Sequence, residues 1–264
     1  MKSILILLEF VFARKAFYNI NIILLKLIIR FIGYNNHSNF NNSGEIHFLR
    51  KICNENPKLC IDIGANAGNY SKYLLENSSS KILAFEPIPQ SFKKLQKIKK
   101  NYLHRFLIYK LGIGEKNSKN IINYNQKNLQ WANFNSEVNQ IDYLQKNNKK
   151  LICTLVTLDN FIKTNIKLFN NGIDLIKIDT EGYEYEVLMG AKSTIKKFKP
   201  KYIQIEYNWH HLFKNVNLYF FSKYLKNYDT YKILPFSKNL MKIDPKRPEH
   251  NYFNYSNIVF IRKE

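Results

Sequence analysis

Acidic side chains stand at or next to the ends of four apolar segments in this sequence. They are Asp62, Glu86, Asp179 and Glu206. If the segments are parallel strands, their carboxyl ends meet at one edge of a sheet, which is where α/β proteins bind their ligands. Carboxylates grouped there can bind a cation, accept hydrogen bonds from hydroxyl groups or remove a proton from a reacting group. The sequence therefore predicts a catalytic site at this edge.

Strand-like and helix-like segments alternate from residue 45 onward, which predicts a parallel sheet with helices on both faces. Residues 115–172 are too long for one crossover, so we expect an added strand pair and a lid-like loop there. The expected strands are 59–63, 81–86, 106–109, 173–179 and 202–207, with further apolar runs at 230–235 and 257–262; the expected helices are 69–77, 89–100, 158–164 and 183–198; the added strands are 121–124 and 151–157, and the polar stretch between them is 126–148.

The loop after the first strand carries two glycines, Gly64 and Gly68, with Asn66 between them. It matches neither the dinucleotide fingerprint nor the phosphate loop, so pyrophosphate and triphosphate ligands are disfavoured. Asp62 before the loop suits a ligand with a cationic group, and Glu86 can accept both hydroxyls of a ribose. A cationic centre, a ribose and no phosphate describe S-adenosylmethionine. The alternative is a doubly wound domain whose carboxylates are simply solvated.

Four stretches of the chain resemble the FkbM-type methyltransferase family. They are Asp62–Ser71, Phe85–Leu95, Thr157–Phe161 and Ile173–Glu184, the last of which continues to residue 191. The resemblance implies a class I methyltransferase (Rossmann-like) fold with a seven-stranded, mainly parallel sheet, and O-methylation, commonly of sugars or secondary metabolites. The residues that we assign to the cofactor are Asp62, Gly64, Asn66, Gly68, Tyr70, Glu86, Pro87 and Gly112.

Methyl transfer from a sulfonium to a hydroxyl requires alignment of two atoms and removal of the hydroxyl proton. The candidate residues follow the fourth and fifth strands: Asp179, Glu181, Glu206 and the pair His210 and His211. This layout is similar to that of TylF-type sugar O-methyltransferases. The similarity implies that Asp179 and Glu206 bind Mg²⁺ and that Glu181 is the base. A metal-free alternative makes one histidine, His210 or His211, the general base.

These residues also have plain structural interpretations. Glu181 can cap the helix predicted from Tyr183, Glu184 can be a surface acid of the first turn, and Asp159 can cap its own helix. The histidine pair can be ordinary surface residues. Trp131, in the polar stretch, either stacks on a sugar ring or packs against the lid or core.

The chain carries 41 Lys and Arg against 20 Asp and Glu, a formal net charge of +21. Lysine makes up 35 of these 41 basic residues, whereas proteins that read bases or clamp phosphates favour the bidentate fork of Arg. We therefore expect solvated lysine faces and no nucleic-acid partner. The three cysteines, at positions 53, 60 and 153, match neither a disulfide framework nor a zinc knuckle, so we expect buried free thiols in a reducing compartment.

Residues 4–33 are strongly apolar but are interrupted by charges, which favours amphipathic helices over a membrane span or a signal peptide. Their apolar side is expected to be covered by a membrane surface, by the catalytic domain or by a dimer partner. Residues 34–44 have the composition of a linker, so we divide the chain into an N-terminal segment, 1–44, and a methyltransferase domain, 45–264. The residues expected to face water are Lys15, Asn19, Lys26 and Arg30, and those expected to be largely buried are Ile22, Ile23, Leu25 and Ile29.

The sequence thus predicts an O-methyltransferase that modifies a sugar hydroxyl in a surface glycan or its precursor. We expect it in the cytoplasm, either free or peripheral at the inner face of the membrane through residues 1–33. The alternatives are a methyltransferase for a lipid-linked or other small acceptor at the membrane, and a binding protein that kept the fold but lost the chemistry. Dependence on Mg²⁺ and a homo-oligomeric state stay open.

Overall fold

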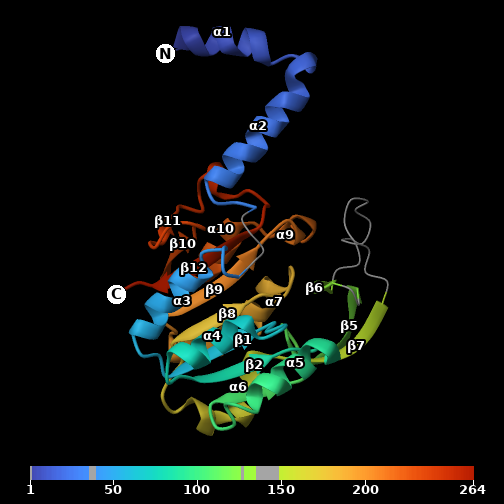
Figure 1. The fold of residues 1–264 in the computed structure, drawn as a ribbon, viewed down its shortest axis with the longest axis vertical. Helices are drawn as coiled ribbons and strands as arrows, with labels where there is room; N and C mark the ends of the chain where they lie inside the picture. Colours follow the sequence, from blue (N-terminus) through green and yellow to red (C-terminus); the bar gives the residue numbers. More distant parts are fainter. Residues whose placement is uncertain (1, 36–39, 126–127, 135–148) are drawn as a thin grey trace.

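A mainly parallel sheet forms the centre of the computed structural model, which describes residues 2–35, 40–125, 128–134 and 149–264 (Figure 1). Its strands are β1 (Leu59–Ile63), β2 (Lys81–Phe85), β3 (Phe106–Tyr109), β8 (Leu175–Ile178), β9 (Tyr202–Tyr207), β10 (Tyr228–Lys232), β11 (Met241–Lys242) and β12 (Ser256–Arg262). Across the sheet their order is β11-β10-β12-β9-β8-β1-β2-β3.

The strand directions confirm the predicted fold class. Strands β3, β2, β1, β8 and β9 pair in parallel, and β12 runs antiparallel between β9 and β10. This is the class I methyltransferase arrangement with one difference, because the two-residue strand β11 pairs with β10 at the edge and makes eight strands instead of seven. Both residues of β11 are exposed, so the sequence has no apolar pattern that would predict this strand.

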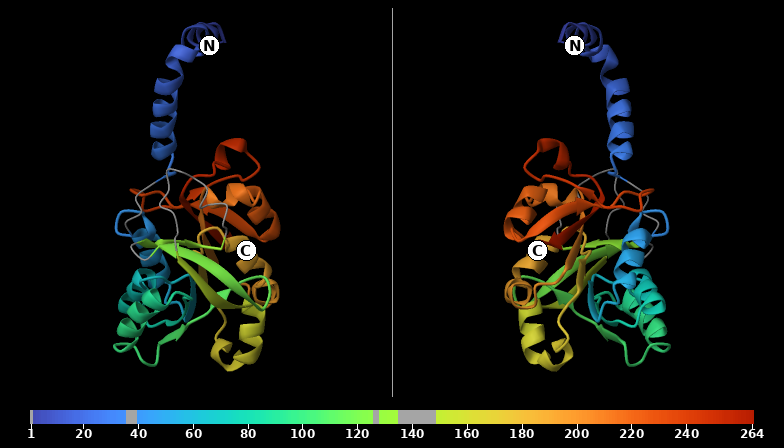
Figure 2. Two further views of the ribbon diagram at one scale, coloured as in Figure 1. Left: turned by 90° about the vertical axis from the view of Figure 1, so that its right-hand side faces the viewer. Right: turned by 90° about the vertical axis from the view of Figure 1, so that its left-hand side faces the viewer.

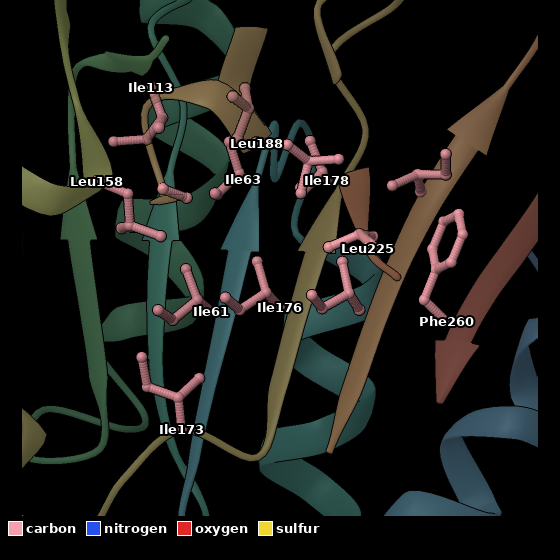
Figure 3. Close-up of a cluster of buried hydrophobic side chains, with 14 of the residues drawn as sticks. Ile61, Ile63, Ile113, Leu158, Ile173, Ile176, Ile178, Leu188, Leu225 and Phe260 are labelled. Atoms are coloured by element: carbon pink, nitrogen blue, oxygen red, sulfur yellow. The ribbon is translucent and has the colours of Figure 1, made fainter. Parts of the chain in front are cut away.

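Alternate residues of the central strands enter two cores, one on each face of the sheet. Ile61 and Ile63 of β1 and Ile176 and Ile178 of β8 point into the same core (Figure 3). Cys60, which directly precedes Ile61 in β1, belongs to the core on the opposite face. Strands buried on both faces need apolar residues at successive positions, which explains the continuous apolar runs in the sequence.

Helices cover both faces. One face carries α3 (Glu45–Asn54), α4 (Asn69–Asn77) and α5 (Pro89–Lys99); the other carries α6 (Leu158–Thr164), α7 (Glu184–Met189), α8 (Lys192–Phe198) and α10 (Leu218–Tyr224). The single helix predicted over 183–198 is wrong, because the chain breaks between α7 and α8. A Cβ on Gly190 would lie 1.9 Å from the carbonyl oxygen of Gly114, so the break brings two backbone segments into direct contact.

Asp159 was expected to cap its own helix, and this expectation is wrong. Thr157 caps α6, while the carboxylate of Asp159 accepts hydrogen bonds from the backbone N–H groups of Ser193 and Thr194 at the start of α8. The acid therefore joins two neighbouring helices and satisfies the free N–H groups of the second one.

The added strand pair belongs to a second sheet with the order β4-β7-β5-β6. Its strands are β4 (Gly112–Ile113), β5 (Ser118–Asn125), β6 (Asn128–Asn133) and β7 (Lys149–Val156). The expected pair corresponds to β5 and β7, which are antiparallel. Of the expected lid, residues 126–127 and 135–148 lie outside the described part of the chain. Trp131 lies in β6, and its side chain is likewise outside what is described.

The N-terminal helices α1 (Lys2–Phe12) and α2 (Tyr18–Phe31) project away from the domain, joined by the short 3-10 helix η1 (Lys15–Phe17) (Figure 2). Helix α1 has no buried residue, and α2 has one, Ile29. Ile23 and Leu25 are 57% and 44% exposed, so the described domain does not cover them. Among the described residues, no helix has the length and apolar character needed to cross a membrane.

Candidate active site

A cavity of about 950 Å³ lies at the carboxyl ends of the parallel strands. Residues that follow β1, β2, β8 and β9 line it, and the small sheet contributes further residues. A volume of this size falls in the range of pockets that enclose small-molecule ligands. The edge of the sheet predicted from strand-end acids is therefore the edge that holds the cavity.

The loop after β1 forms one wall of the cavity and touches the end of β8. Gly64 has a φ of +79°, and a Cβ there would lie 1.8 Å from the carbonyl oxygen of Asp179. Only glycine permits both this backbone conformation and this close approach. The loop assigned to the cofactor is thereby held beside the acids assigned to catalysis. The predicted cofactor residues that line the cavity are Gly64, Asn66, Tyr70, Glu86, Pro87 and Gly112.

Glu86 lies at the end of β2, with 4% of its surface exposed. One carboxylate oxygen accepts the backbone N–H of Asn66 and the other accepts the backbone N–H of Ile88, both at 2.8 Å. Burial raises the pKa of Glu86 to about 7, although both hydrogen bonds act in the opposite direction. Each oxygen keeps another lone pair. The residue therefore fits the hydroxyls of a ribose in S-adenosylmethionine.

Asp62 and Gly68 lie behind the cavity wall and do not line it. Asp62 is 1% exposed and accepts a hydrogen bond from the Ser71 hydroxyl at 2.6 Å. Its other oxygen is 3.6 Å from Nζ of Lys177. Asp62 therefore contacts Ser71 of α4 and Lys177, whereas Gly68 ends the loop directly before α4. Direct contact of either residue with a cofactor stays a prediction.

Three carboxylates, those of Asp179, Glu181 and Glu206, converge in the cavity. One oxygen from each lies within 4.8 Å of the other two. Burial raises the pKa of Glu181 and of Glu206 well above the usual range, and the neighbouring negative charges raise both further. Several oxygen donors around one point fit a divalent cation such as Mg²⁺. They also fit a group of hydroxyls that donate hydrogen bonds.

The turn that presents Glu181 is held by Glu184. Glu181 has a φ of +53°, which is uncommon for a residue other than glycine. One oxygen of Glu184 accepts the backbone N–H groups of Thr180 and Gly182, at 2.7 and 3.2 Å. The fully buried Glu184 is therefore no surface acid, and the N–H groups of this turn meet Glu184 instead of Glu181. Both structural interpretations drawn from the sequence are wrong, because the turn's donors point inward and need a buried acceptor.

The two histidines are buried, so the interpretation as surface residues is also wrong. His210 lines the cavity, and its Nδ1 lies 3.5 Å from a carboxylate oxygen of Glu181. Burial lowers the pKa of His210 to about 4, which leaves the ring neutral at neutral pH. His211 does not line the cavity. Of the pair, His210 is the one placed to meet a ligand.

A buried lysine beside the three clustered acids was not predicted from the sequence. Lys177 lies in register with Asp62 of β1 and Gln204 of β9, and its Nζ lies 3.0 Å from Asp179. Burial would lower the pKa of Lys177, but the charges of Asp179, Asp62 and Glu45 outweigh burial and raise it. The signal in the sequence was a single lysine inside the apolar strand Leu-Ile-Lys-Ile. It supplies one positive charge beneath an acidic cavity.

Gln204 shows the same kind of signal, a lone polar residue in an apolar strand. It accepts a hydrogen bond from the Tyr70 hydroxyl at 2.6 Å and donates one to Glu45 at 2.8 Å. Tyr70 and Glu45 both line the cavity. Asp62, Lys177 and Gln204 thus form a polar row across β1, β8 and β9. Through Gln204 this row holds two side chains of the cavity lining in place.

The small sheet supplies an apolar wall of the cavity, whereas Asp179, Glu181 and Glu206 form its acidic floor. Phe134 lines the cavity and packs against Tyr183 with ring centroids 4.7 Å apart. The other apolar residues of this wall are Ile122, Leu129 and Ala132. An acidic floor facing an apolar wall suits a ligand that carries both hydroxyl groups and carbon surface.

Comparisons with known proteins place residues 62–233 in the family described as the methyltransferase FkbM domain. No curated protein matched. Similar solved structures include an O-methyltransferase from Bacillus cereus in complex with S-adenosylhomocysteine, at a TM-score of 0.48 and 10% identity, covering 97% of this chain and 95% of that one. Another is an rRNA methylase from Streptococcus thermophilus, at a TM-score of 0.44 and 10% identity, covering 86% and 99%. The family match spans more than half of the chain.

Proposed function

This chain belongs to the FkbM methyltransferase family, whose enzymes use S-adenosylmethionine, and we propose that it methylates a hydroxyl of a sugar in a surface glycan or its precursor. The observation that carries the proposal is the convergence of Asp179, Glu181 and Glu206 in the same cavity as Glu86 and the glycine loop. One end of the cavity suits the cofactor, and the other offers bases for a hydroxyl.

Methyl transfer to a hydroxyl needs a base, because a sugar hydroxyl is a weak nucleophile at neutral pH. When bound, S-adenosylmethionine supplies a methyl group on a positively charged sulfur. We assign removal of the hydroxyl proton to Glu181. In the absence of a metal ion, burial and the charges of Asp179 and Glu184 raise its pKa, which makes it a stronger base than an ordinary carboxylate.

Neighbouring contacts favour Glu181 over the other candidates. Glu206 is already engaged by the side-chain N–H of Asn208 at 2.6 Å, whereas the contact from Asn208 to Glu181 is 3.5 Å. His210, with a pKa near 4, is a weaker base than Glu181. It is better suited to orient the Glu181 carboxylate, which lies 3.5 Å from its ring nitrogen.

A divalent cation also belongs to the proposal. Asp179 and Glu206 would hold Mg²⁺, with Glu181 next to it, and the ion would acidify the acceptor hydroxyl. Lys177 already offsets part of the negative charge at Asp179, so the carboxylates can orient hydroxyls through hydrogen bonds as well.

The acceptor class follows from the two sides of the cavity. Carboxylates accept hydrogen bonds from sugar hydroxyls, and an aromatic ring such as Phe134 can pack on the carbon face of a sugar. The high lysine content favours recruitment of an anionic acceptor such as a nucleotide-linked sugar.

The experiment is transfer of a radiolabelled methyl group from S-adenosylmethionine to a panel of nucleotide sugars, free oligosaccharides and non-sugar alcohols. We expect label in a sugar acceptor, and loss of that label in Glu181→Gln while cofactor binding is kept. Label confined to non-sugar acceptors would refute the sugar assignment. Failure to bind S-adenosylmethionine would refute the methyltransferase mechanism as a whole.

A further inference from the structure

The N-terminal helices expose an unusually large apolar surface. In α1, Ile4, Leu7 and Phe10 are 65%, 63% and 69% exposed. The remaining exposed large apolar residues of this segment are Leu5, Ile6, Leu8, Val11, Phe12, Tyr18, Ile20, Ile23, Leu24, Leu25, Leu27, Ile28, Phe31 and Ile32. Scattered apolar residues are normal on a surface, but so many exposed apolar side chains on two consecutive helices mark a membrane or protein interface.

The charges of this segment are nearly all positive. Residues 2–31 contain five basic residues, Lys2, Arg14, Lys15, Lys26 and Arg30, against the single acid Glu9. On α2, Asn19, Lys26 and Arg30 lie on one side of the helix at helical spacing. Apolar side chains combined with lysine and arginine match the boundary between the acyl chains and the anionic headgroups of a bilayer.

The elbow between the two helices is built from specific contacts. The side-chain N–H of Asn21 donates to the carbonyl of Phe12 at 2.9 Å, and the rings of Phe12 and Phe17 meet edge to face at 5.2 Å. Arg14 donates to the carbonyl of Phe10 and lies over its ring. Asn21, the polar residue on the otherwise apolar side of α2, is thus used inside the elbow. The pair of helices forms a defined unit.

The end of α2 is fastened to the domain at the rim of the cavity. Lys232 of β10 donates to the carbonyl of Ile32 and lies 3.8 Å from the ring centroid of Tyr34, which is fully buried. The backbone N–H of Asn35 donates to the carbonyl of Tyr255 at 2.8 Å. Asn35 and Tyr255 both line the cavity. Helices α1 and α2 are therefore attached to the domain beside the active site.

We propose that α1 and α2 form a monotopic anchor that binds the surface of a bilayer containing anionic lipids and holds the cavity next to it. The geometry agrees with attachment at one surface, because neither helix has the length needed to span a bilayer. If the proposed methyl transfer is correct, an acceptor sugar attached to a membrane lipid is the class of substrate that this placement serves. The anchor itself does not depend on that function.

The test is flotation of the full-length protein with vesicles of phosphatidylcholine alone and of phosphatidylcholine mixed with phosphatidylglycerol. We expect flotation with the anionic vesicles. The double variant Ile4→Asp/Leu7→Asp should lose it, whereas Leu103→Asp, which changes an apolar residue of the domain that is 61% exposed, should float like the parent. Lys26→Gln/Arg30→Gln should weaken binding roughly 25-fold, since each basic residue near an anionic surface contributes about 5-fold. Its matched control is Lys93→Gln/Lys97→Gln on α5.

Three results would refute the anchor proposal. They are no flotation of the parent, equal flotation of the parent with neutral and anionic vesicles, and equal flotation of the parent and all variants. Analytical ultracentrifugation without vesicles addresses the rival occupant, a second copy of the chain. A dimer that dissociates in Ile4→Asp/Leu7→Asp and does not float would assign the surface to self-association. Calorimetric titration with S-adenosylmethionine on the same samples distinguishes the two proposals. A parent protein that binds the cofactor but does not float refutes the anchor alone, and one that floats but does not bind the cofactor refutes the proposed enzyme alone.

Discussion

Nε2 of His211 lies 2.9 Å from a carboxylate oxygen of Glu184, and both side chains are buried. Burial would raise the pKa of Glu184, but the hydrogen bonding and charge of His211 and the N–H of Thr180 lower it to about 2. The same carboxylate holds the turn that carries Glu181. This buried pair thus links α7 to α9 (His210–Phe213) beneath the proposed base.

We predict that Glu184→Ala lowers the free energy of unfolding by about 3–5 kcal/mol, because it leaves a buried histidine and several N–H groups without their partner. Urea denaturation measures this loss. Glu186→Ala, in the same helix and paired with Lys214 at a partly exposed position, should cost no more than about 1 kcal/mol. Equal effects of the two substitutions would contradict a special role for the buried pair.

Glu86→Ala should weaken S-adenosylmethionine binding by about 1–3 kcal/mol, roughly 5- to 150-fold, because the ribose hydroxyls lose their acceptor. Isothermal titration calorimetry gives the affinity. Circular dichroism must show a folded variant, since Glu86 also accepts two backbone N–H groups. Glu249→Ala, at an exposed position, is the control, and unchanged binding in folded Glu86→Ala would remove this residue from the cofactor site.

The raised pKa of Glu86 predicts a pH-dependent stability in the absence of cofactor. Its ordinary value of 4.5 rises to about 7 on folding, so between these values the folded state holds more of this proton than the unfolded state. Stability contributed by Glu86 must therefore fall as pH rises from about 4.5 to 7 and stay level above. Unfolding free energies of the parent, measured relative to those of Glu86→Gln across this range, test the sign; a rising difference would refute it.

Glu181→Gln should reduce methyl transfer to the acceptor found in the panel by roughly 100- to 10,000-fold, the usual contribution of a general base. Cofactor affinity should stay near that of the parent, because the substitution lies outside the ribose contact. Single-turnover rates with labelled cofactor separate the two quantities. His210→Phe is the comparison: a larger loss in that variant than in Glu181→Gln would move the role of base to the histidine.

Binding of Mg²⁺ should raise the melting temperature of the parent, because the ion relieves repulsion among Asp179, Glu181 and Glu206. In Glu206→Gln this shift of the melting temperature should disappear. Without metal, the variant should melt at a higher temperature than the parent, because it has one carboxylate fewer in the cluster. Thermal melts with MgCl₂ are compared with melts in NaCl at equal ionic strength. A shift of the same size in both proteins would argue against a site at these carboxylates.

Much of the site could be predicted from local sequence. Apolar runs ending in Asp179 or Glu206, and the glycine loop before α4, are short-range patterns whose geometry depends little on the rest of the chain. Since parallel strands place their carboxyl ends together, these residues had to meet once the strands were assigned. The grouping of Asp179, Glu181 and Glu206 was predicted for this reason.

The surroundings of these residues could not be predicted in the same way. Glu181 and Glu184 are three positions apart and are both acids, yet one lines the cavity and the other is sealed against His211. The helix expected over 183–198 was divided by a contact with Gly114, which lies far away in sequence. Lys177 met Asp62 through strand register, a relationship that no local pattern contains.

The sequence by itself determined the alternation of strands and helices, the glycine loop and the acids at the strand ends, because each depends on the order of neighbouring residues. Tertiary structure alone decided which acid faces the cavity, which lysine balances it, and that the apolar sides of α1 and α2 remain uncovered by the described domain. These features depend on register and packing between distant segments. An amphipathic pattern shows that a face needs a partner, but only the folded chain shows whether its own domain provides one.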